Sequence, residues 1–401
     1  MSLLSHADIN VSHKKVLVRV DFNVPLKEDG SIADLMRISE SLPTIHSILE
    51  RGGSVILLSH LGRPKGIKNK KYTLEPCKEA LSKLLNREVL FAKDCMGKET
   101  LSTVSKLKPG EVLLLENLRF YAAEENPNLD SSFTETLASY GDIYINDAFA
   151  ACHRDHSSIT SLAKKFPKSA APGFLLEKEI QALTLLSTSP SKPFHAIIGG
   201  SKISSKLGVI QSLLEKVDVL YIGGAMAFTF FKAFEYPIGN SLFEPDFIPI
   251  AKDLINECLK RKIHLCLPKD IVEADSFSEH SIKKTITIAK EGVDAKWYGM
   301  DIGPLTLNSW KESLKNAASI FWNGPVGVFE LPSFSEGTFS LVRFLSQLSS
   351  YRVIGGGDSA AAVHELALDK KFTHISTGGG AALEFIEQGT LPGIKALTQQ
   401  K

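Results

Sequence analysis

Charged and polar side chains directly follow short apolar segments in the first half of the sequence. The guanidinium group of arginine is planar and pairs with a carboxylate or phosphate through two parallel hydrogen bonds. If the apolar segments are parallel strands, their carboxyl ends form the sheet edge where ligands bind. One arginine there is usually a surface ion pair, but four loops repeat the pattern. The sequence therefore predicts a site for a small polyanion, such as a phosphorylated acid, with candidate residues Asp21, Asn23, Arg37, His60, Arg63, Arg119 and Arg154.

Glycine occupies the corresponding positions in the second half. Apolar segments there are followed by Gly199-Gly200, Gly223-Gly224, Gly324, Gly355–Gly357 and Gly378–Gly380. Glycine allows positive φ and close approach of backbone N–H groups, and before a helix such loops suit phosphate groups. For a single loop of this kind, turn geometry is about as good an explanation as ligand binding, but five such loops in one half of the chain are much harder to dismiss. Neither G-x-x-x-x-G-K-[ST] nor G-x-G-x-x-G occurs. We therefore expect nucleotide phosphates bound without a P-loop, and a dinucleotide site is disfavoured.

Two lysines and two carboxylates add to this second pattern. Lys202 and Lys206 are spaced to share one face of a helix start, where an anion would relieve their repulsion. The alternative is a solvated basic helix start. Asp358 follows three glycines and could be a helix N-cap or, beside nucleotide phosphates, a ligand of Mg²⁺. Glu330 could accept hydrogen bonds from ribose hydroxyls.

Alternation of apolar runs with amphipathic stretches predicts an α/β protein with two Rossmann-like domains, each a parallel sheet flanked by helices. We expect an N-terminal polyanion-binding domain over 1–172, an interdomain helix over 173–186 and a nucleotide-binding domain over 187–401. The proline- and glycine-containing segment 166–173 marks the junction. Strands are expected at 16–20, 55–58, 89–91, 112–115 and 143–145, and then at 196–198, 219–222, 263–267, 320–322, 353–354 and 374–376.

Bulk composition excludes several protein classes. The 401 residues carry a net charge of +1, without the basic excess of nucleic-acid or membrane-surface proteins. No apolar stretch is long enough to span a bilayer, and the N-terminus does not resemble a signal peptide. The five cysteines form no C-x-x-C pair, which favours free thiols in a reducing cytoplasm.

Seven strings, in this order, resemble the phosphoglycerate kinase family. They are Arg19-Val-Asp21-Phe-Asn23-Val-Pro25, Ser59-His60-Leu-Gly-Arg63-Pro64, Glu116-Asn-Leu-Arg119-Phe120, His153-Arg154-Asp-His156-Ser-Ser158, Phe321-Trp-Asn323-Gly-Pro-Val-Gly-Val-Phe-Glu330, Gly355-Gly-Gly-Asp358-Ser359 and Ser376-Thr377-Gly-Gly-Gly380. The resemblance covers nearly the whole chain. It implies reversible phosphoryl transfer from 1,3-bisphosphoglycerate to ADP, giving 3-phosphoglycerate and ATP, with Mg²⁺. It also implies a monomer that closes by a hinge, with the last ~15 residues packing back on the N-terminal domain.

The resemblance also implies roles for individual residues. The triose would contact Asp21, Phe22, Asn23, Arg37, His60, Leu61, Gly62, Arg63, Arg119 and Arg154. The nucleotide would contact Lys202, Lys206, Gly299, Asn323, Glu330, Gly356, Gly357, Asp358 and Ser359, with Mg²⁺ on Asp358. Because the attacking group is the substrate's own carboxylate, no general base is needed, and His60 and His153 are assigned none. Arg37, Lys202 and Lys206 would stabilise the transferring group.

Three positions depart from the family's commonest pattern. Ser201 and Ser205 stand where alanine and aspartate are frequent, and Ala225 stands where a third glycine is frequent. Because both lysines remain, we expect altered nucleotide affinity at most. Two other functions stay open at this point. A catalytically silent binding protein should have lost a charged transfer residue, and a nicotinamide-dependent oxidoreductase should show the dinucleotide fingerprint.

Overall fold

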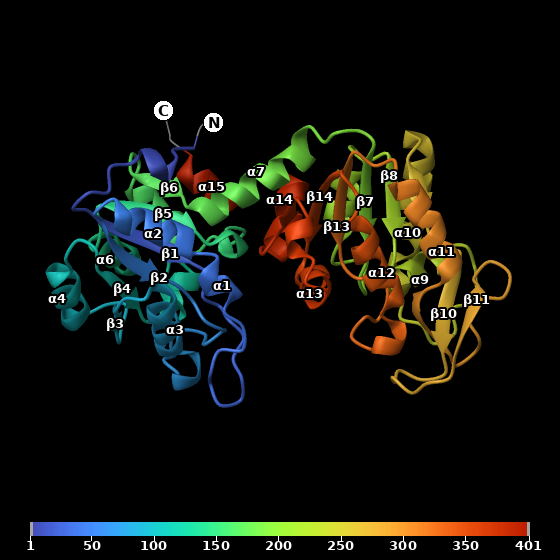
Figure 1. The fold of residues 1–401 in the computed structure, drawn as a ribbon, viewed down its shortest axis with the longest axis horizontal. Coiled ribbons are helices and arrows are strands. Elements are labelled where there is room, and N and C mark those ends of the chain that lie inside the picture. Colours follow the sequence, from blue (N-terminus) through green and yellow to red (C-terminus); the bar gives the residue numbers. More distant parts are fainter. Residues whose placement is uncertain (1–2, 399–401) are drawn as a thin grey trace. The chain divides into compact units, whose positions relative to one another are not determined.

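The computed structural model describes residues 3–398, and the chain divides into two compact units. The first unit contains the chain up to Ile180 and again from Thr390 onward, whereas the second contains Gln181–Gly389. Helix α7 (Phe174–Thr188) crosses this division, and α15 (Pro392–Leu397) belongs to the first unit (Figure 1). No helix among the described residues is both long enough and apolar enough to cross a membrane.

The first unit is built on a six-stranded sheet in the order β3-β4-β2-β1-β5-β6, and each pair of neighbours is parallel. Every residue of β2 and β4 is buried, as expected for strands covered on both faces. The strands are β1 (Lys15–Val20), β2 (Ser54–Leu58), β3 (Val89–Ala92), β4 (Val112–Leu115), β5 (Ile143–Asp147) and β6 (Ala170–Pro172). The helices are α1 (Met36–Ser39), α2 (Leu42–Glu50), α3 (Glu75–Leu85), α4 (Lys98–Lys106), α5 (Ala122–Glu125) and α6 (Ser131–Ala138).

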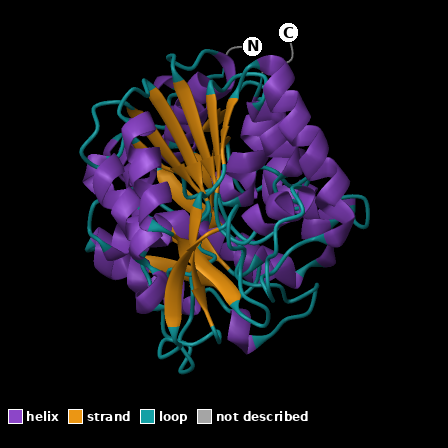
Figure 2. Ribbon diagram, turned by 90° about the vertical axis from the view of Figure 1, so that its right-hand side faces the viewer, coloured by secondary structure: helices purple, strands orange, loops and turns teal. Residues whose placement is uncertain are grey.

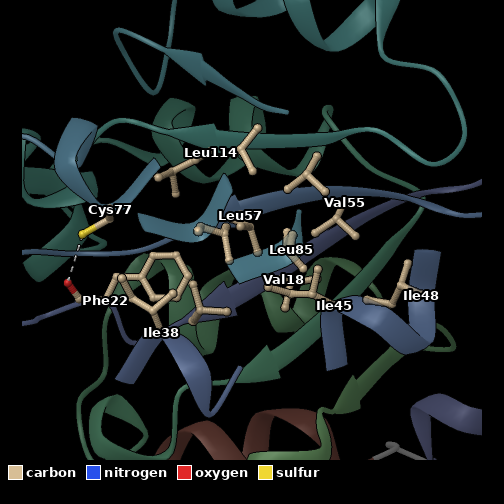
Figure 3. Packing of buried hydrophobic residues seen from close by; sticks show 14 of the residues in the cluster. Val18, Phe22, Ile38, Ile45, Ile48, Val55, Leu57, Cys77, Leu85 and Leu114 are labelled. Carbon is tan, nitrogen blue, oxygen red and sulfur yellow. Dashed lines mark hydrogen bonds between the residues drawn. The ribbon is translucent and has the colours of Figure 1, made fainter. Parts of the chain in front are cut away.

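One face of this sheet packs into a hydrophobic core of the first unit (Figure 3). Alternate residues of a strand share a face, so Val18 of β1 meets Val55 and Leu57 of β2 there. Ile45 of α2 and Leu85 of α3 cover them. Burying each such side chain contributes roughly 1.5–3 kcal/mol. This packing gives the loops at the carboxyl edge of the sheet a rigid base.

The second unit has a parallel six-stranded sheet in the order β15-β14-β13-β7-β8-β9. Figure 2 shows the strands of the protein lying between helices. The strands are β7 (Phe194–Ile198), β8 (Val219–Ile222), β9 (His264–Cys266), β13 (Ser319–Asn323), β14 (Tyr351–Gly355) and β15 (His374–Ile375). The helices are α8 (Leu207–Leu213), α9 (Ala227–Ala233), α10 (Ile248–Arg261), α11 (Pro304–Leu314), α12 (Glu336–Leu345), α13 (Gly357–Glu365) and α14 (Gly380–Gln388). The predicted α/β class with two parallel sheets is therefore confirmed.

A small antiparallel sheet in the second unit was not expected. It pairs β10 (Asp270–Ala274) with β11 (Lys283–Thr287) and β12 (Tyr298–Ile302). The first three residues of β11 are exposed, so the strand lacks the apolar run from which the other strands were predicted. Its pairing partners are fixed by tertiary contacts instead.

Candidate active site

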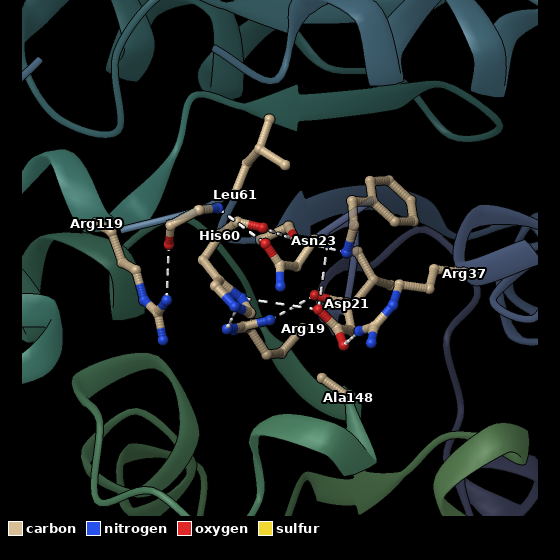
Figure 4. Close-up of polar contacts among 12 residues, drawn as sticks. Arg19, Asp21, Asn23, Arg37, His60, Leu61, Arg119 and Ala148 are labelled. Atoms are coloured by element: carbon tan, nitrogen blue, oxygen red, sulfur yellow. Dashed lines mark hydrogen bonds and ion pairs between the residues drawn. The ribbon is translucent and has the colours of Figure 1, made fainter. Parts of the chain in front are cut away.

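Loops of the first unit meet at the carboxyl edge of its sheet, as Figure 4 shows. Strand β1 lies beside β2, and β2 lies beside β4, so the loops that follow them are neighbours. Asp21 and Asn23 follow β1, and His60 follows β2. Arg119 lies in the short helix η3 (Leu118–Phe120) after β4. Polar residues predicted from separate loops are thus brought together at one edge.

Asp21 connects the loop after β1 to α1. It is 8% exposed and forms an ion pair with Arg37, whose Nη1 donates a hydrogen bond to Oδ2 of Asp21. The side chain of Arg37 remains 34% exposed. The Asn23 side-chain oxygen accepts a hydrogen bond from the backbone N–H of Gly62 at 2.8 Å. Arg37 is therefore held at one end and still accessible to a ligand.

Arg119 and Arg154 make this edge strongly positive. Nη1 of Arg119 donates a hydrogen bond to the Gly62 carbonyl at 2.8 Å, and its Nε lies 3.3 Å from Glu125 Oε1. Burial lowers the pKa of Arg119 to about 10, with a further lowering from Arg154, so the guanidinium stays charged at neutral pH. Burial, followed by the charges of nearby arginines that include Arg154, lowers the pKa of His60 well below its usual range. His60 is therefore neutral among cations.

Three residues that were predicted to contact the triose do not belong to this group of hydrogen-bonded polar side chains. Arg63 is exposed and makes no side-chain hydrogen bond or ion pair with any residue in the range 3–398. The side chains of Phe22 and Leu61 are buried in the hydrophobic core, with exposures of 0% and 2%. Their backbone groups also bond within the protein, because the Phe22 N–H donates to the Ser59 hydroxyl at 2.9 Å and the Leu61 carbonyl accepts from Asn117 Nδ2 at 2.7 Å.

A buried polar cluster beneath this edge was missed in the sequence. It consists of Arg19, Glu124, His156 and Ser158, all less than 9% exposed. Arg19 interrupts the apolar run 16–20 of strand β1, and that interruption is the one signal that could have revealed the cluster. Its partners are more than a hundred residues away in the sequence, so their proximity could not be read from spacing.

Two glycine loops of the second unit pack against each other after β7 and β13. A Cβ atom on Gly199 would lie 2.1 Å from the Pro325 carbonyl oxygen, and one on Gly324 would lie 2.3 Å from the Gly199 carbonyl oxygen. Gly324 also has φ +90°, which disfavours any side chain. Its backbone N–H donates to the Ser359 hydroxyl at 2.6 Å. Glycine at these positions lets the two loops and the start of α13 approach closely.

A cavity of about 510 Å³ opens in the second unit. Its walls are largely apolar, which suits a flat base. Gly299, Glu330 and Asp358, all predicted for nucleotide binding, line it together. A Cβ on Gly299 would lie 2.0 Å from the ring of Phe228, so glycine is needed for that ring to pack there. Further wall residues were not predicted from the sequence, among them Phe228, Leu242, Tyr298, Met300, Asp301 and Val326.

Lys206 lies beside the predicted phosphate loops. Its Nζ donates a hydrogen bond to the side-chain oxygen of Asn323, the last residue of β13. Burial lowers the pKa of Lys206 to about 8, although the charge of Asp358 opposes this shift. A Cβ on Gly356, which has φ +88°, would lie 2.7 Å from Nδ2 of Asn323. Gly357, Asp358 and Ser359 then form the first turn of α13.

The expectation that Lys202 and Lys206 share a helix face is wrong. Helix α8 begins only at Leu207, so Lys206 is its N-cap residue and Lys202 lies in the preceding loop, exposed to solvent. The Ser205 hydroxyl donates to the Lys202 carbonyl at 2.9 Å. The backbone N–H and the hydroxyl of Ser204 both donate to Glu244. Such serine hydrogen bonds compete with helix formation.

The residues around Asp358 fit a magnesium ion that arrives with a nucleotide. No group of three or more metal-binding side chains occurs among residues 3–398. Mg²⁺ is commonly held by one or two carboxylates together with substrate phosphates, so a full protein cage is not needed. Asp358 supplies one carboxylate at the start of α13, close to Lys206.

Known proteins resemble this chain along its whole length. The family model described as phosphoglycerate kinase matches residues 6–389. Phosphoglycerate kinase of Borrelia turicatae is 48% identical over 99% of this chain and 100% of its own, and that of Fervidobacterium nodosum is 46% identical over 100% of both. The structure of phosphoglycerate kinase from Coxiella burnetii is 38% identical and superposes with a TM-score of 0.89 over 99% of each chain. The chain therefore belongs to the phosphoglycerate kinase family.

Proposed function

We propose that this chain catalyses the reaction of its family, the reversible transfer of a phosphoryl group from 1,3-bisphosphoglycerate to ADP, which gives 3-phosphoglycerate and ATP. The observation that carries the proposal is the contrast between the two sheet edges. The first unit offers arginines to a polyanion, whereas the second offers glycine loops and a cavity to a nucleotide. A phosphoryl group moves from one bound substrate to the other in a single direct step.

The triose is assigned to the first unit. Its negative charges are matched by the arginines and its polar groups by the side chains around Asp21. The proposed contacts are Asp21, Asn23, Arg37, His60, Arg63, Arg119 and Arg154, and Phe22, Leu61 and Gly62 would support them from within the same loops. The ion pair with Asp21 supports a catalytic role for Arg37, because it orients a partly exposed guanidinium.

The nucleotide is assigned to the second unit. The base would occupy the cavity at Gly299, and Glu330 would bind the ribose. The proposed phosphate contacts are Lys202, Lys206, Asn323, Gly356, Gly357 and Ser359. Asp358 would hold Mg²⁺ together with the phosphates, and the ion would supply charge neutralisation.

The chemistry requires no general base. In the direction of ATP consumption, a carboxylate oxygen of 3-phosphoglycerate forms a bond to the γ-phosphorus. The bond from that phosphorus to the β,γ-bridging oxygen breaks, and its electron pair leaves on ADP. Arg37, Lys202 and Lys206 stabilise the charge that develops on the transferring group. Because the substrates are assigned to different units, transfer requires a hinge movement that brings them together and excludes water.

We also propose that the protein acts as a cytoplasmic monomer and has no nucleic-acid partner. The free cysteines support a reducing compartment, the near-zero net charge supports the absence of a nucleic-acid partner, and the monomeric state rests on the resemblance to the family. Ser201, Ser205 and Ala225 would adjust nucleotide affinity without removing activity, because both lysines are present.

The test is turnover of 3-phosphoglycerate by the purified chain with ATP and Mg²⁺, followed by coupling ADP formation to a second enzyme. We expect turnover that depends on both substrates, and none when either is omitted. Binding of both substrates in calorimetry without turnover would instead support a silent binding protein. ADP formation that does not require 3-phosphoglycerate would contradict the assignment of the acceptor.

A further inference from the structure

Arg19 is a fully buried cation that lies directly behind the proposed triose site. It is 0% exposed, and its guanidinium faces three acceptors at once. Its Nε donates to the Ser158 hydroxyl at 2.8 Å, Nη1 donates to the Val20 carbonyl, and Nη2 lies 3.1 Å from Nδ1 of His60. Figure 4 shows the guanidinium of Arg19 against the His60 ring. A planar fork of five N–H groups can serve all three acceptors simultaneously.

The contact with His60 fixes the position of that ring's hydrogen. Arginine has donors only, so Nδ1 of His60 must be the acceptor and carries no hydrogen. A neutral imidazole then carries its single hydrogen on Nε2. Nε2 makes no hydrogen bond to any residue in the range 3–398, so this N–H is free to donate to a ligand.

Ser158 and Glu124 hold Arg19 in this orientation. The Ser158 hydroxyl accepts from Arg19 and donates to Oε1 of Glu124 at 2.6 Å, while the Ser158 backbone N–H donates to Oε2 at 3.0 Å. Glu124 and Ser158 are both 0% exposed. The three side chains therefore form one hydrogen-bonded chain that starts at a buried carboxylate and ends at the His60 ring.

We propose that Arg19, Ser158 and Glu124 are positioning residues that hold His60 as the neutral Nε2–H tautomer, so that His60 donates a hydrogen bond to an acceptor oxygen of the bound triose. The role of His60 as a triose contact rests on the proposed function. The tautomer itself does not, because it is a property of the free protein.

The alternative tautomer of His60, with its hydrogen on Nδ1, explains why the contact with Arg19 is needed. Nδ1 of His60 also lies 3.8 Å from Oδ1 of Asp21. Without Arg19, a hydrogen on Nδ1 would bond to Asp21 and draw that carboxylate away from Arg37. The charged groups that act on the ring are Arg19, Asp21, Arg119 and Arg154. His156 is a further titratable neighbour, but burial lowers its pKa to about 3, so it is neutral at neutral pH. Loss of Arg19 therefore weakens triose binding through His60 and disturbs the catalytic arginine.

The first test reads the tautomer directly in the free protein. Long-range ¹H–¹⁵N spectra of ¹⁵N-histidine protein distinguish protonated from unprotonated ring nitrogens, and His60→Gln identifies the His60 signals among the eleven histidines. We expect an unprotonated Nδ1 in the wild type and a protonated Nδ1 in Arg19→Met/Glu124→Gln. The paired substitution avoids leaving a buried carboxylate without its cation. Ser158→Ala, a smaller change, should shift the tautomer in the same direction. A protonated Nδ1 in the wild type overturns the proposal.

The second test asks whether Arg19 acts through His60. Glutamine places an amide nitrogen near the position of Nε2, whereas asparagine places it near Nδ1, so His60→Gln should retain more triose affinity than His60→Asn. Arg19→Met/Glu124→Gln should raise the KM for 3-phosphoglycerate by about 10- to 100-fold in the wild-type background, the worth of a hydrogen bond to a charged group. The same pair should have only a small effect in His60→Gln. Equal effects in both backgrounds would show that Arg19 acts independently of His60 and would overturn the proposal. An inactive wild type would refute the proposed function while the tautomer measurement still stands.

Discussion

The ammonium group of Lys206 donates a hydrogen bond to the side-chain oxygen of Asn323, at the carboxyl end of β13. Burial lowers the pKa of Lys206 to about 8, so the free enzyme loses this cation just above neutral pH. A cation assigned to nucleotide phosphates is thereby coupled to pH within a range that kinetics can reach.

We predict an alkaline limb in kcat/KM for ATP, with an apparent pKa near 8, because this parameter reports the free enzyme. Bound phosphates stabilise the charged amine, so the limb in kcat should lie at higher pH. Lys206→Arg keeps its charge and should abolish the limb near pH 8. Lys202→Arg is the matched control and should retain it. A limb that persists in Lys206→Arg would assign it to another group.

Arg37→Ala should lower kcat by about 10²- to 10³-fold, the usual cost of removing one donor from a developing anion. The nucleotide Kd should stay unchanged, because the nucleotide is assigned to the other unit. Steady-state kinetics and calorimetry with ATP measure the two quantities. Arg87→Ala is the control, since Arg87 is an exposed arginine of the same unit whose side chain donates a hydrogen bond to the Gly110 carbonyl. Unchanged turnover in Arg37→Ala would refute its catalytic role.

Gly393→Ala should destabilise the first unit by about 1–3 kcal/mol through overpacking. A Cβ on Gly393 would lie 2.7 Å from Cγ2 of Ile159 and 3.1 Å from Sγ of Cys152. Urea unfolding followed by far-ultraviolet circular dichroism measures the change. All three tryptophans lie in the second unit, so their fluorescence transition should move less. Gly380→Ala meets open space and should be close to neutral. Equal stability of Gly393→Ala and the wild type would mean that α15 is not held against this site.

Asp301→Asn should change stability in a pH-dependent manner. Asp301 accepts hydrogen bonds from the backbone N–H groups of Gly337 and Ile302, and burial raises its pKa to about 7. Between the unfolded value of 3.8 and this value, the folded state binds more protons than the unfolded state, so stability falls as pH rises. At 1.36 kcal/mol for each unit, the wild type should lose about 4 kcal/mol relative to Asp301→Asn across this range.

Tryptophan fluorescence in urea at a series of pH values measures this difference, because it reports the second unit that contains Asp301. The difference should be smallest below pH 4 and level off above pH 7, once the folded carboxyl is ionised. A constant difference across the range would show that Asp301 is already ionised in the folded protein at low pH.

Local pattern was a good guide wherever structure depends on neighbouring residues. Apolar strands buried on both faces are continuous in the sequence, so five strands of the first parallel sheet and all six of the second could be predicted within a few residues. Strand β6 was missed, because it has only three residues and lies in the proline-containing segment 166–173 that was assigned to the junction. The same pattern failed for β11, whose exposed lysines resemble a loop. It also failed at Lys202, because the bonds from Ser204 to Glu244 span forty residues and delay the start of α8.

By itself, the sequence determined which residue types follow each strand, and hence an arginine-bearing edge in one unit and glycine loops in the other. Only the tertiary structure decided that Arg19 bonds to Ser158 and His60, that the Phe22 side chain packs in the core and that Lys206 is largely buried. The physical reason is the separation along the sequence over which each kind of interaction acts. Strand and turn preferences act over a few residues, whereas the burial of a charge and the hydrogen on an imidazole depend on partners that folding brings from far along the chain.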